Sequence, residues 1–231
     1  MILERSTHPS WLSNTYLVAD REGGTGIFVD SGAPLEPLIA LAKASDLTVS
    51  HLLVTHGHAD HTSGNESLQR RFGLEIVTLP VEPFASGDLR IEALRTPGHS
   101  PDSLSFSVTG ELCFTGDTLF AGSVGSSASD FADLRRSVME VLLARPPETR
   151  LLPGHGGETT VAGELERNPF VRLWRGLDPE GQERCRVGGR EAQLVLWADD
   201  YDGGFKAWVR FDDGRDAIVG GSRVERESHE G

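Results

Sequence analysis

The stretch Thr55-His56-Gly57-His58-Ala59-Asp60-His61 places three histidines and an aspartate within six residues, directly after the apolar run Leu52-Leu53-Val54. Side chains at i and i+2 of an extended segment point to the same side, so His56 and His58 can converge on one ion. The pair Asp60-His61 lies one step further along the chain, points elsewhere and suits a second ion. Because neutral imidazole and carboxylate are borderline-hard ligands, the stretch favours zinc, iron or manganese over calcium or magnesium.

An ordinary polar helix start is the alternative interpretation of this stretch. Asp60 or Thr62 would then only cap the helix that follows. That interpretation gives no reason for so many titratable side chains to be crowded in one place. We therefore favour metal binding.

Three later turns each carry one more candidate ligand. His99 lies in Thr96-Pro97-Gly98-His99-Ser100, Asp117 in Phe114-Thr115-Gly116-Asp117-Thr118, and His155 in Pro153-Gly154-His155-Gly156. Each signal is weak by itself, because a histidine or a Gly-Asp pair is common in turns. Together they put five of the chain's eight histidines at the ends of expected strands. His51, in contrast, lies inside a strand pattern and is expected to be part of the scaffold.

Composition and charge narrow the range of partners. The chain has 231 residues (25.0 kDa), enough for one large domain or for one domain with a small appendage. A formal charge of -13 and a pI near 5.0 argue against binding to a nucleic-acid backbone or to an anionic membrane surface. Cys113 and Cys185 belong to no Cys-x-x-Cys pattern. Because the sequence shows no signal-peptide pattern and no apolar run approaching the ~18 residues that span a bilayer, we expect a cytoplasmic protein.

Strand and helix patterns alternate along the first 170 residues. Repeated strand–helix units followed by hairpin-like strands predict an α/β fold of mixed layers. The expected strands are 14–20, 26–30, 49–55, 76–79, 89–94, 104–108, 112–114 and 151–152, and the expected helices are one opened by Pro34, one at 60–72 and one at 130–145.

The sequence after residue 170 differs in kind. We divide the chain into a catalytic domain (1–170), a linker (171–184) and a small β module (185–231). An antiparallel sheet or SH3-like barrel is predicted for the module by three alternating patterns, 192–197, 205–211 and 217–219, with Asp- and Gly-rich turns between them. We interpret the module as packing on the catalytic domain or on a second copy of the chain, with substrate recognition as the alternative.

The alternation within 205–211 makes a specific prediction about one tryptophan. If Ala207 and Val209 face the core of the module, Trp208 faces away from it. Trp208 is then either exposed or buried against a neighbouring surface.

The ordered set His56-x-His58-x-Asp60-His61, His99, Asp117 and His155 resembles the metallo-β-lactamase superfamily. Within it, the chain is most similar to the glyoxalase II-type hydroxyacylglutathione hydrolases and their smaller relatives. The resemblance runs from about residue 14 to residue 170 and includes the strings Val29-Asp30-Ser31-Gly32, Phe114-Thr115-Gly116-Asp117-Thr118-Leu119-Phe120 and Glu164-x-x-x-Asn168-Pro169-Phe170. Asp30 ends a strand and could orient a metal ligand or form a turn, and both interpretations stay open.

The resemblance implies an αββα sandwich with its site at one edge of the two sheets. It also implies two divalent metal ions, with zinc as the first choice and iron or manganese as alternatives. Asp60 and Asp117 are the candidate catalytic residues. By the same resemblance, His56, His58 and His99 would hold one metal, Asp60, His61 and His155 would hold the other, and Asp117 would bridge the two.

The resemblance implies hydrolysis by a metal-bridging hydroxide. A shared carboxylate and a shared hydroxide would offset the repulsion between the two cations. The two cations would lower the pKa of the shared water from about 15.7 towards 7. The hydroxide would attack an ester-type carbonyl while a metal stabilised the oxyanion. The expected activity is therefore that of a dinuclear metal-dependent hydrolase that cleaves a small-molecule thioester or related ester.

Two departures from the glyoxalase II pattern bear on the substrate. Those enzymes typically continue after the bridging aspartate with Gly-Arg and a nearby aspartate, whereas this chain has Gly122-Ser123-Val124-Gly125-Ser126-Ser127. They also bind glutathione on a C-terminal helical domain, and the sequence after residue 170 does not indicate one. Glutathione is therefore not indicated as the thiol.

Other functions of the superfamily remain alternatives. A mononuclear iron persulfide dioxygenase would use only His56, His99 and Asp117. A lactonase or β-lactamase-type hydrolase would use the same hydroxide on another activated acyl group. The chain could also be a metal-stabilised binding protein whose C-terminal module recognises a partner, and a homodimer is also considered.

Overall fold

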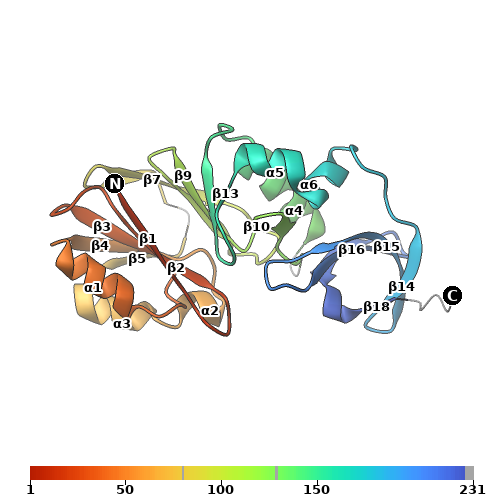
Figure 1. Ribbon diagram of the computed structural model, residues 1–231, viewed down its shortest axis with the longest axis horizontal. Helices are drawn as coiled ribbons and strands as arrows, with labels where there is room; N and C mark the ends of the chain where they lie inside the picture. The colour runs from red at the N-terminus through yellow and green to blue at the C-terminus, as the bar shows by residue number, and fades with distance from the viewer. Residues whose placement is uncertain (80, 128–129, 227–231) are drawn as a thin grey trace.

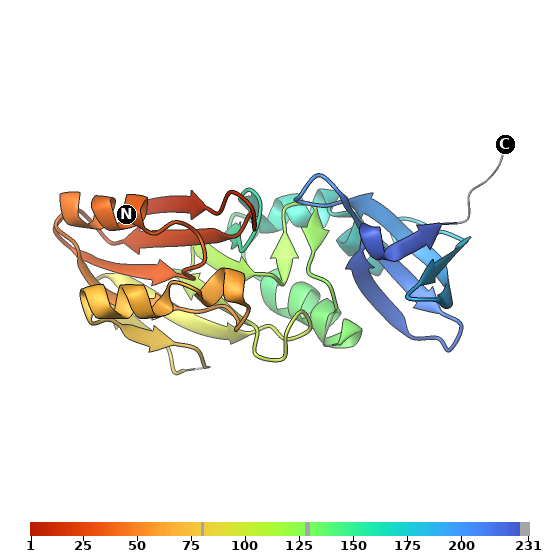
Figure 2. The same ribbon diagram turned by 90° about the horizontal axis from the view of Figure 1, so that it is seen from below.

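The computed structural model describes residues 1–79, 81–127 and 130–226. The molecule is elongated, with two sheets and their helices at one end and in the middle, and the C-terminal sheet at the other end (Figure 1). Figure 2 shows the same order of parts from below. Within the described ranges, no helix is long and apolar enough to cross a membrane.

The first sheet has the strand order β1-β2-β3-β4-β5, antiparallel from β1 to β3 and parallel from β3 to β5. Side chains alternate between its two faces, so Tyr16 and Val18 of β2 point to the second sheet while Leu17 points to helices α1 and α3. The elements of this half are β1 (Ile2–Thr7), β2 (Asn14–Ala19), β3 (Thr25–Val29), β4 (Thr48–Leu53), β5 (Glu75–Val77), α1 (Glu36–Ala44) and α3 (Asn65–Phe72).

The second sheet has the order β13-β12-β9-β8-β7-β6, in which β9 and β12 are parallel and the other neighbours antiparallel. The space between the two sheets is filled by apolar side chains, among them Tyr16 and Phe114, whose ring centroids lie 5.1 Å apart. The strands are β6 (Phe84–Ser86), β7 (Leu89–Arg95), β8 (Leu104–Val108), β9 (Leu112–Gly116), β12 (Arg150–Pro153) and β13 (Thr159–Thr160), and a short hairpin of β10 (Leu119–Phe120) and β11 (Ser123–Val124) follows β9.

Helices cover the outer face of the second sheet and complete the predicted αββα sandwich. The helix expected from Asp130 forms as α4 (Phe131–Arg136) continued by a π-helical segment, η1 (Ser137–Leu142). The side chain of Asp130 caps it by accepting a hydrogen bond from the Asp133 amide. The layer is completed by α5 (Val161–Arg167) and α6 (Pro169–Trp174).

The single helix expected over residues 60–72 is wrong, because the chain forms α2 (Ala59–Thr62) and α3 with a break between them. In a continuous helix, the His61 carbonyl would accept a hydrogen bond from the Asn65 amide. It instead accepts one from the amide of Ser31 at 2.8 Å. This tertiary bond ends α2 one turn after it begins.

The C-terminal module is an antiparallel sheet, as predicted, curled into a half-barrel with the order β17-β16-β15-β14-β18. The boundary predicted at residue 170 falls inside α6, whose Phe170 and Val171 stay packed in the core of the sandwich. The module's first strand begins at 183 instead of 185, and the division into two domains stays a prediction. The strands are β14 (Glu183–Val187), β15 (Arg190–Asp199), β16 (Phe205–Phe211), β17 (Asp216–Gly220) and β18 (Val224–Arg226), and the 3-10 turn η2 (Gly221–Arg223) precedes the last.

Trp208 joins the module to the sandwich. Ala207 and Val209 lie in the module's own core, while Trp208, only 5% exposed, lies in the cluster formed with the helices. Its ring lies 5.2 Å from that of Phe131 and 6.3 Å from that of Trp174. The module therefore packs against the sandwich through one face of β16.

We expect Trp208→Ala to destabilise the protein by about 3–5 kcal/mol, because it empties a large buried site between two parts of the fold. Urea unfolding followed by circular dichroism measures the loss. Phe205→Ala is the matched control, since Phe205 is on the same strand but 45% exposed. Equal unfolding midpoints for the two variants would show that the Trp208 contact does not hold the module in place.

Candidate metal centre

The structure brings all seven predicted ligands together where the loops after four strands meet. The first four come from the segment after β4 and from α2, and His99, Asp117 and His155 follow β7, β9 and β12. Their ligand atoms form three overlapping groups, in each of which the atoms lie within 4.8 Å of one another. The groups are His56, His58 and His99; His56, His61 and Asp117; and Asp60, His61 and His155.

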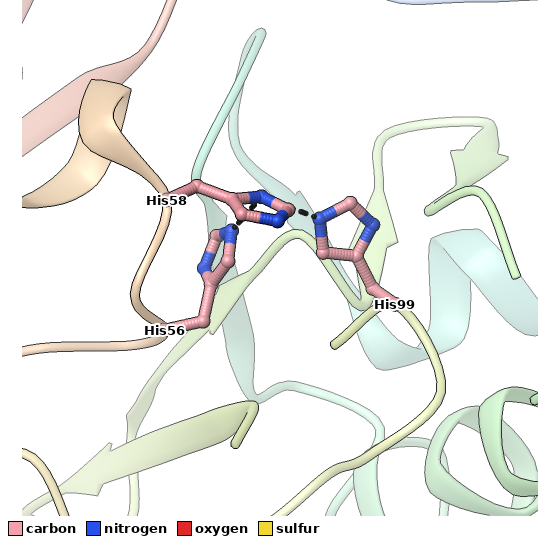
Figure 3. A group of neighbouring side chains, drawn as sticks. All are labelled: His56, His58 and His99. Carbon is pink, nitrogen blue, oxygen red and sulfur yellow. Dashed lines mark hydrogen bonds between the residues drawn. The ribbon is translucent and has the colours of Figure 1, made fainter. Parts of the chain in front are cut away.

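The first group consists of three imidazoles that point toward a common centre (Figure 3). Nδ1 of His58 lies 2.9 Å from Nε2 of His56 and 3.2 Å from Nε2 of His99. His56 and His58 come from one loop and His99 from another, so the group depends on the contact between the two loops. Three nitrogen atoms so close together are the donor set of a tetrahedral metal site with one position open.

Asp60, His61 and His155, called the second group from here on, mix carboxylate and imidazole. Oδ2 of Asp60 lies 3.3 Å from Nε2 of His155 and 3.6 Å from Nε2 of His61. His61 and His155 are buried, whereas the Asp60 side chain is 27% exposed. The group therefore has one side open to solvent or substrate.

Asp117 lies between the two groups. Its Oδ2 is 3.6 Å from Nε2 of His99 and 3.5 Å from Nε2 of His155, and its Oδ1 is 3.4 Å from Nε2 of His61. The fold leaves room for it at Gly154, where a Cβ atom would lie only 2.4 Å from Oδ1 of Asp117. Any side chain at that position would displace the carboxylate.

Asp30 contacts one predicted ligand of the second group, which supports the first of its two interpretations. Its Oδ2 lies 2.8 Å from Nδ1 of His61, and its Oδ1 accepts a hydrogen bond of 2.8 Å from the Thr55 amide. The backbone of Asp30 has φ 55°, a conformation that non-glycine residues rarely adopt. A carboxylate on the far nitrogen of a ligating histidine fixes its tautomer and ring orientation.

Unpaired buried atoms show that these residues fit divalent cations. Nε2 of His61 and Oδ1 of Asp117 are buried and have no hydrogen-bond partner among the described residues. Unpaired polar atoms in a protein interior are costly, and a cation between them would satisfy both. The donor set, imidazole nitrogen and carboxylate oxygen, is one that zinc and iron accept.

The charges within the site divide the histidines into two kinds. Burial lowers the pKa of His56 to about 4 and also lowers that of His99. Burial also acts to lower the pKa of His61, but the carboxylates of Asp117 and Asp30 outweigh it and raise that pKa to about 11. For His155, hydrogen bonds to Asp117 and Asp60 outweigh burial and raise the pKa to about 9.

The same contacts act on the carboxylate. Burial raises the pKa of Asp117, but His61 and His155 outweigh that effect and hold the pKa well below its usual range. Asp117 is therefore ionised, and in the metal-free protein the protons on His61 and His155 compensate the acidic side chains. A bound cation would replace those protons.

Sequence reasoning missed one side chain of the site, Tyr201. It belongs to the loop between β15 and β16, and its ring stacks on that of His155 with centroids 4.6 Å apart. The sequence marks this loop only as a turn. No local pattern in the sequence indicates which surface the turn touches.

His51 lies apart from the seven ligands, as expected for a scaffold residue. Its Nδ1 lies 2.8 Å from the Ser50 hydroxyl, and its ring lies 4.8 Å from that of Phe84 on the second sheet. Its surroundings are therefore those of a histidine that packs between strands.

A sequence profile of the metallo-beta-lactamase superfamily matches residues 9–90 and 73–155. The chain belongs to the metallo-beta-lactamase superfamily. Its class is accordingly that of the metal-dependent hydrolases, with His-rich sites for divalent metals. The match ends at His155, so it leaves out Tyr201 and the C-terminal module.

Two curated relatives are similar over most of their own length. Hydroxyacylglutathione hydrolase GloC of Haemophilus influenzae is 30% identical over 196 residues, covering 68% of this chain and 92% of the relative. Probable polyketide biosynthesis zinc-dependent hydrolase BaeB of Bacillus velezensis is 28% identical over 172 residues, covering 65% and 76%. Both names describe hydrolases.

A solved structure is similar in the same way. TTHA1623 in a di-iron-bound form superposes with a TM-score of 0.60 at 32% identity, covering 74% of this chain and all of that chain (100%). That protein holds two iron ions.

Metal binding at pH 7 should release at least two protons, because His61 and His155 have pKa values raised to about 11 and about 9 and must lose their protons to act as ligands. Ionisation of a metal-bound water would add a third. The apparent affinity should therefore rise as the pH rises towards 9. Calorimetry with zinc in two buffers of different ionisation enthalpy measures the number released. His51→Ala should release the same number, and the absence of release in the parent protein would contradict this account of the site.

Proposed function

We propose that this protein is a dinuclear metal-dependent hydrolase that cleaves a small thioester or related ester. The observation that carries the proposal is the position of Asp117 between two complete groups of three ligands. A structural site needs one closed set of ligands, whereas here two groups of ligands share one carboxylate and Asp60 is partly exposed. The substrate would be a small molecule.

The side chains have distinct parts in this proposal. His56, His58 and His99 would hold one ion, and Asp60, His61 and His155 the other, with Asp117 shared. Bound divalent cations would supply a nucleophile from water at neutral pH and would stabilise the oxyanion of the carbonyl under attack. Asp117 stays ionised through its imidazole neighbours, and Asp30 keeps Nε2 of His61 turned into the site.

Asp60 has the second catalytic part. Its side chain is 27% exposed, whereas that of Asp117 is 9% exposed, so Asp60 is the carboxylate that substrate and water can reach. A partly exposed carboxylate beside the ions would accept a hydrogen bond from the attacking water and so orient it. We assign to it both binding of the second ion and orientation of the nucleophile.

The glyoxalase II-like subtype is supported by the similarity to GloC, named as a hydroxyacylglutathione hydrolase. The zinc of our proposal is supported by the name of BaeB, and a pair of ions by the di-iron form of TTHA1623. The segment after Asp117 and the small β module differ from the pattern typical of glyoxalase II, so our proposal does not name glutathione as the thiol.

The persulfide dioxygenase alternative requires one iron held by three residues. It would leave Asp60, His61 and His155 without a part, although Asp30 holds His61 in place at 2.8 Å. A group of ligands with its own orienting carboxylate favours two ions.

Metal analysis combined with a substrate panel tests the proposal. We expect two equivalents of zinc-like metal per chain and turnover of a thioester, with lactone, β-lactam and persulfide substrates in the same panel. Asp117→Asn should reduce turnover by more than the about 10–100-fold typical of residues that only orient a ligand, because it serves both ions. His51→Ala should change neither metal content nor turnover. One equivalent of iron with oxygen uptake on a persulfide would replace the proposal.

A further inference from the structure

The loop between β15 and β16 is the part of the C-terminal module that contacts the metal centre. The ring of Tyr201 stacks on that of His155 with an interplanar angle of 22° and meets the ring of Phe120 edge-on at 4.7 Å. The approach is close, since a Cβ atom on Gly156 would lie 3.2 Å from Cβ of Tyr201. Gly156 also has φ 75°, a conformation that favours glycine.

A buried ion pair holds this loop in place. Nζ of Lys206 lies 2.9 Å from Oδ2 of Asp200, and the two side chains are only 7% and 6% exposed. Oδ1 of Asp200 accepts hydrogen bonds from the Tyr201 amide and from the Ser123 hydroxyl of β11. The paired charges are costly to separate, so the loop is fixed to both the module and the sandwich.

Only the ring of Tyr201, and not its hydroxyl, has a partner among the described residues. Its ring covers His155, but its hydroxyl makes no hydrogen bond with the residues that the structure describes, and the side chain is partly exposed. A tyrosine that only supported its neighbour would not need a hydroxyl. An apolar ring with a free hydroxyl at the edge of a polar site is suited to contact a ligand.

We propose that Tyr201 is a substrate-positioning residue, contributed by the C-terminal module. This inference rests on the proposed function and names a specificity element within the same site. The ring forms the wall beside His155, and the hydroxyl donates a hydrogen bond to a polar group of the acyl moiety. The substrate class is an acyl thioester with an apolar group beside the carbonyl, large enough to reach from the metal centre to this wall.

The C-terminal module contacts the surroundings of the metal centre at a second place. The module also holds the segment after Asp117, because Ser127 and Ile218 exchange two hydrogen bonds, of 3.0 Å and 2.7 Å. The neighbouring Ser126 carbonyl lies 3.3 Å from Nδ1 of His99. The module thus touches the surroundings of both ligand groups, and Tyr201 is the part that lies beside the second one.

The test compares Tyr201→Ala and Tyr201→Phe with the control Phe205→Ala, which removes an exposed aromatic ring of the same module, one stacked on Trp197. Each metal-loaded variant is assayed for metal content, for KM and kcat on S-benzoyl and S-acetyl thioesters, and for binding of benzyl mercaptan and ethanethiol by calorimetry. Because a thiolate is a good ligand for zinc-like metals and is not turned over, these thiols would report on the wall even if no thioester is cleaved.

We expect Tyr201→Ala to keep its metal and to raise KM for the benzoyl thioester by about threefold to tenfold, the effect of a lost aromatic contact, with a smaller change for the acetyl thioester. Its affinity for benzyl mercaptan should fall by a similar factor, and that for ethanethiol should not. Tyr201→Phe should keep the benzyl mercaptan affinity and should raise KM for the benzoyl thioester by less than Tyr201→Ala does.

Two results would overturn the inference. Unchanged KM and thiol affinities in Tyr201→Ala would show that the residue does not touch the ligand. Loss of metal with unchanged thiol affinities after metal is restored would show that it only supports His155. Absence of thioester turnover in the parent protein would contradict the proposed function instead. The thiol affinities would then decide whether Tyr201 contacts the ligand.

Discussion

One buried carboxylate, that of Asp117, is the group on which the rest of the site depends. Its two oxygens face imidazoles of both ligand groups, and a charge so far from solvent is stable only with positive partners. The imidazoles of His61 and His155 are such partners, because Asp117 raises the pKa of both. The same field that raises these pKa values also attracts divalent cations, so the site is prepared for them before they bind.

Backbone hydrogen bonds between loops keep this carboxylate in position. The Thr55 carbonyl, after β4, accepts a hydrogen bond from the Leu104 amide at the start of β8, and the Gly116 carbonyl, at the end of β9, accepts one from the Gly154 amide after β12. These strand ends belong to the two sheets, and the apolar core between the sheets fixes their relative position. The C-terminal module adds a further layer of support, because the packing of Trp208 fixes the half-barrel that carries Tyr201. Stability and substrate contact are therefore coupled through one small β sheet.

Much of the fold and most of the site could be predicted from the sequence, because their signals are local. The histidine stretch follows a strand, and each later ligand lies in a turn that Gly or Pro marks. The order of these residues therefore predicted that they form one site. The break between α2 and α3 could not be predicted, because it depends on a hydrogen bond from Ser31, a residue thirty positions from His61. Tyr201 was missed for the same reason, since this turn residue contacts His155 only when the module packs against the sandwich.

Anomalous diffraction from crystals grown with zinc tests the central claim, that Asp117 is shared by two metal ions, most directly. The account predicts two peaks in the site, one among His56, His58 and His99 and one among Asp60, His61 and His155, each within bonding distance of the Asp117 carboxylate. A single peak held by only one group, with Asp117 turned away from it, would contradict the claim.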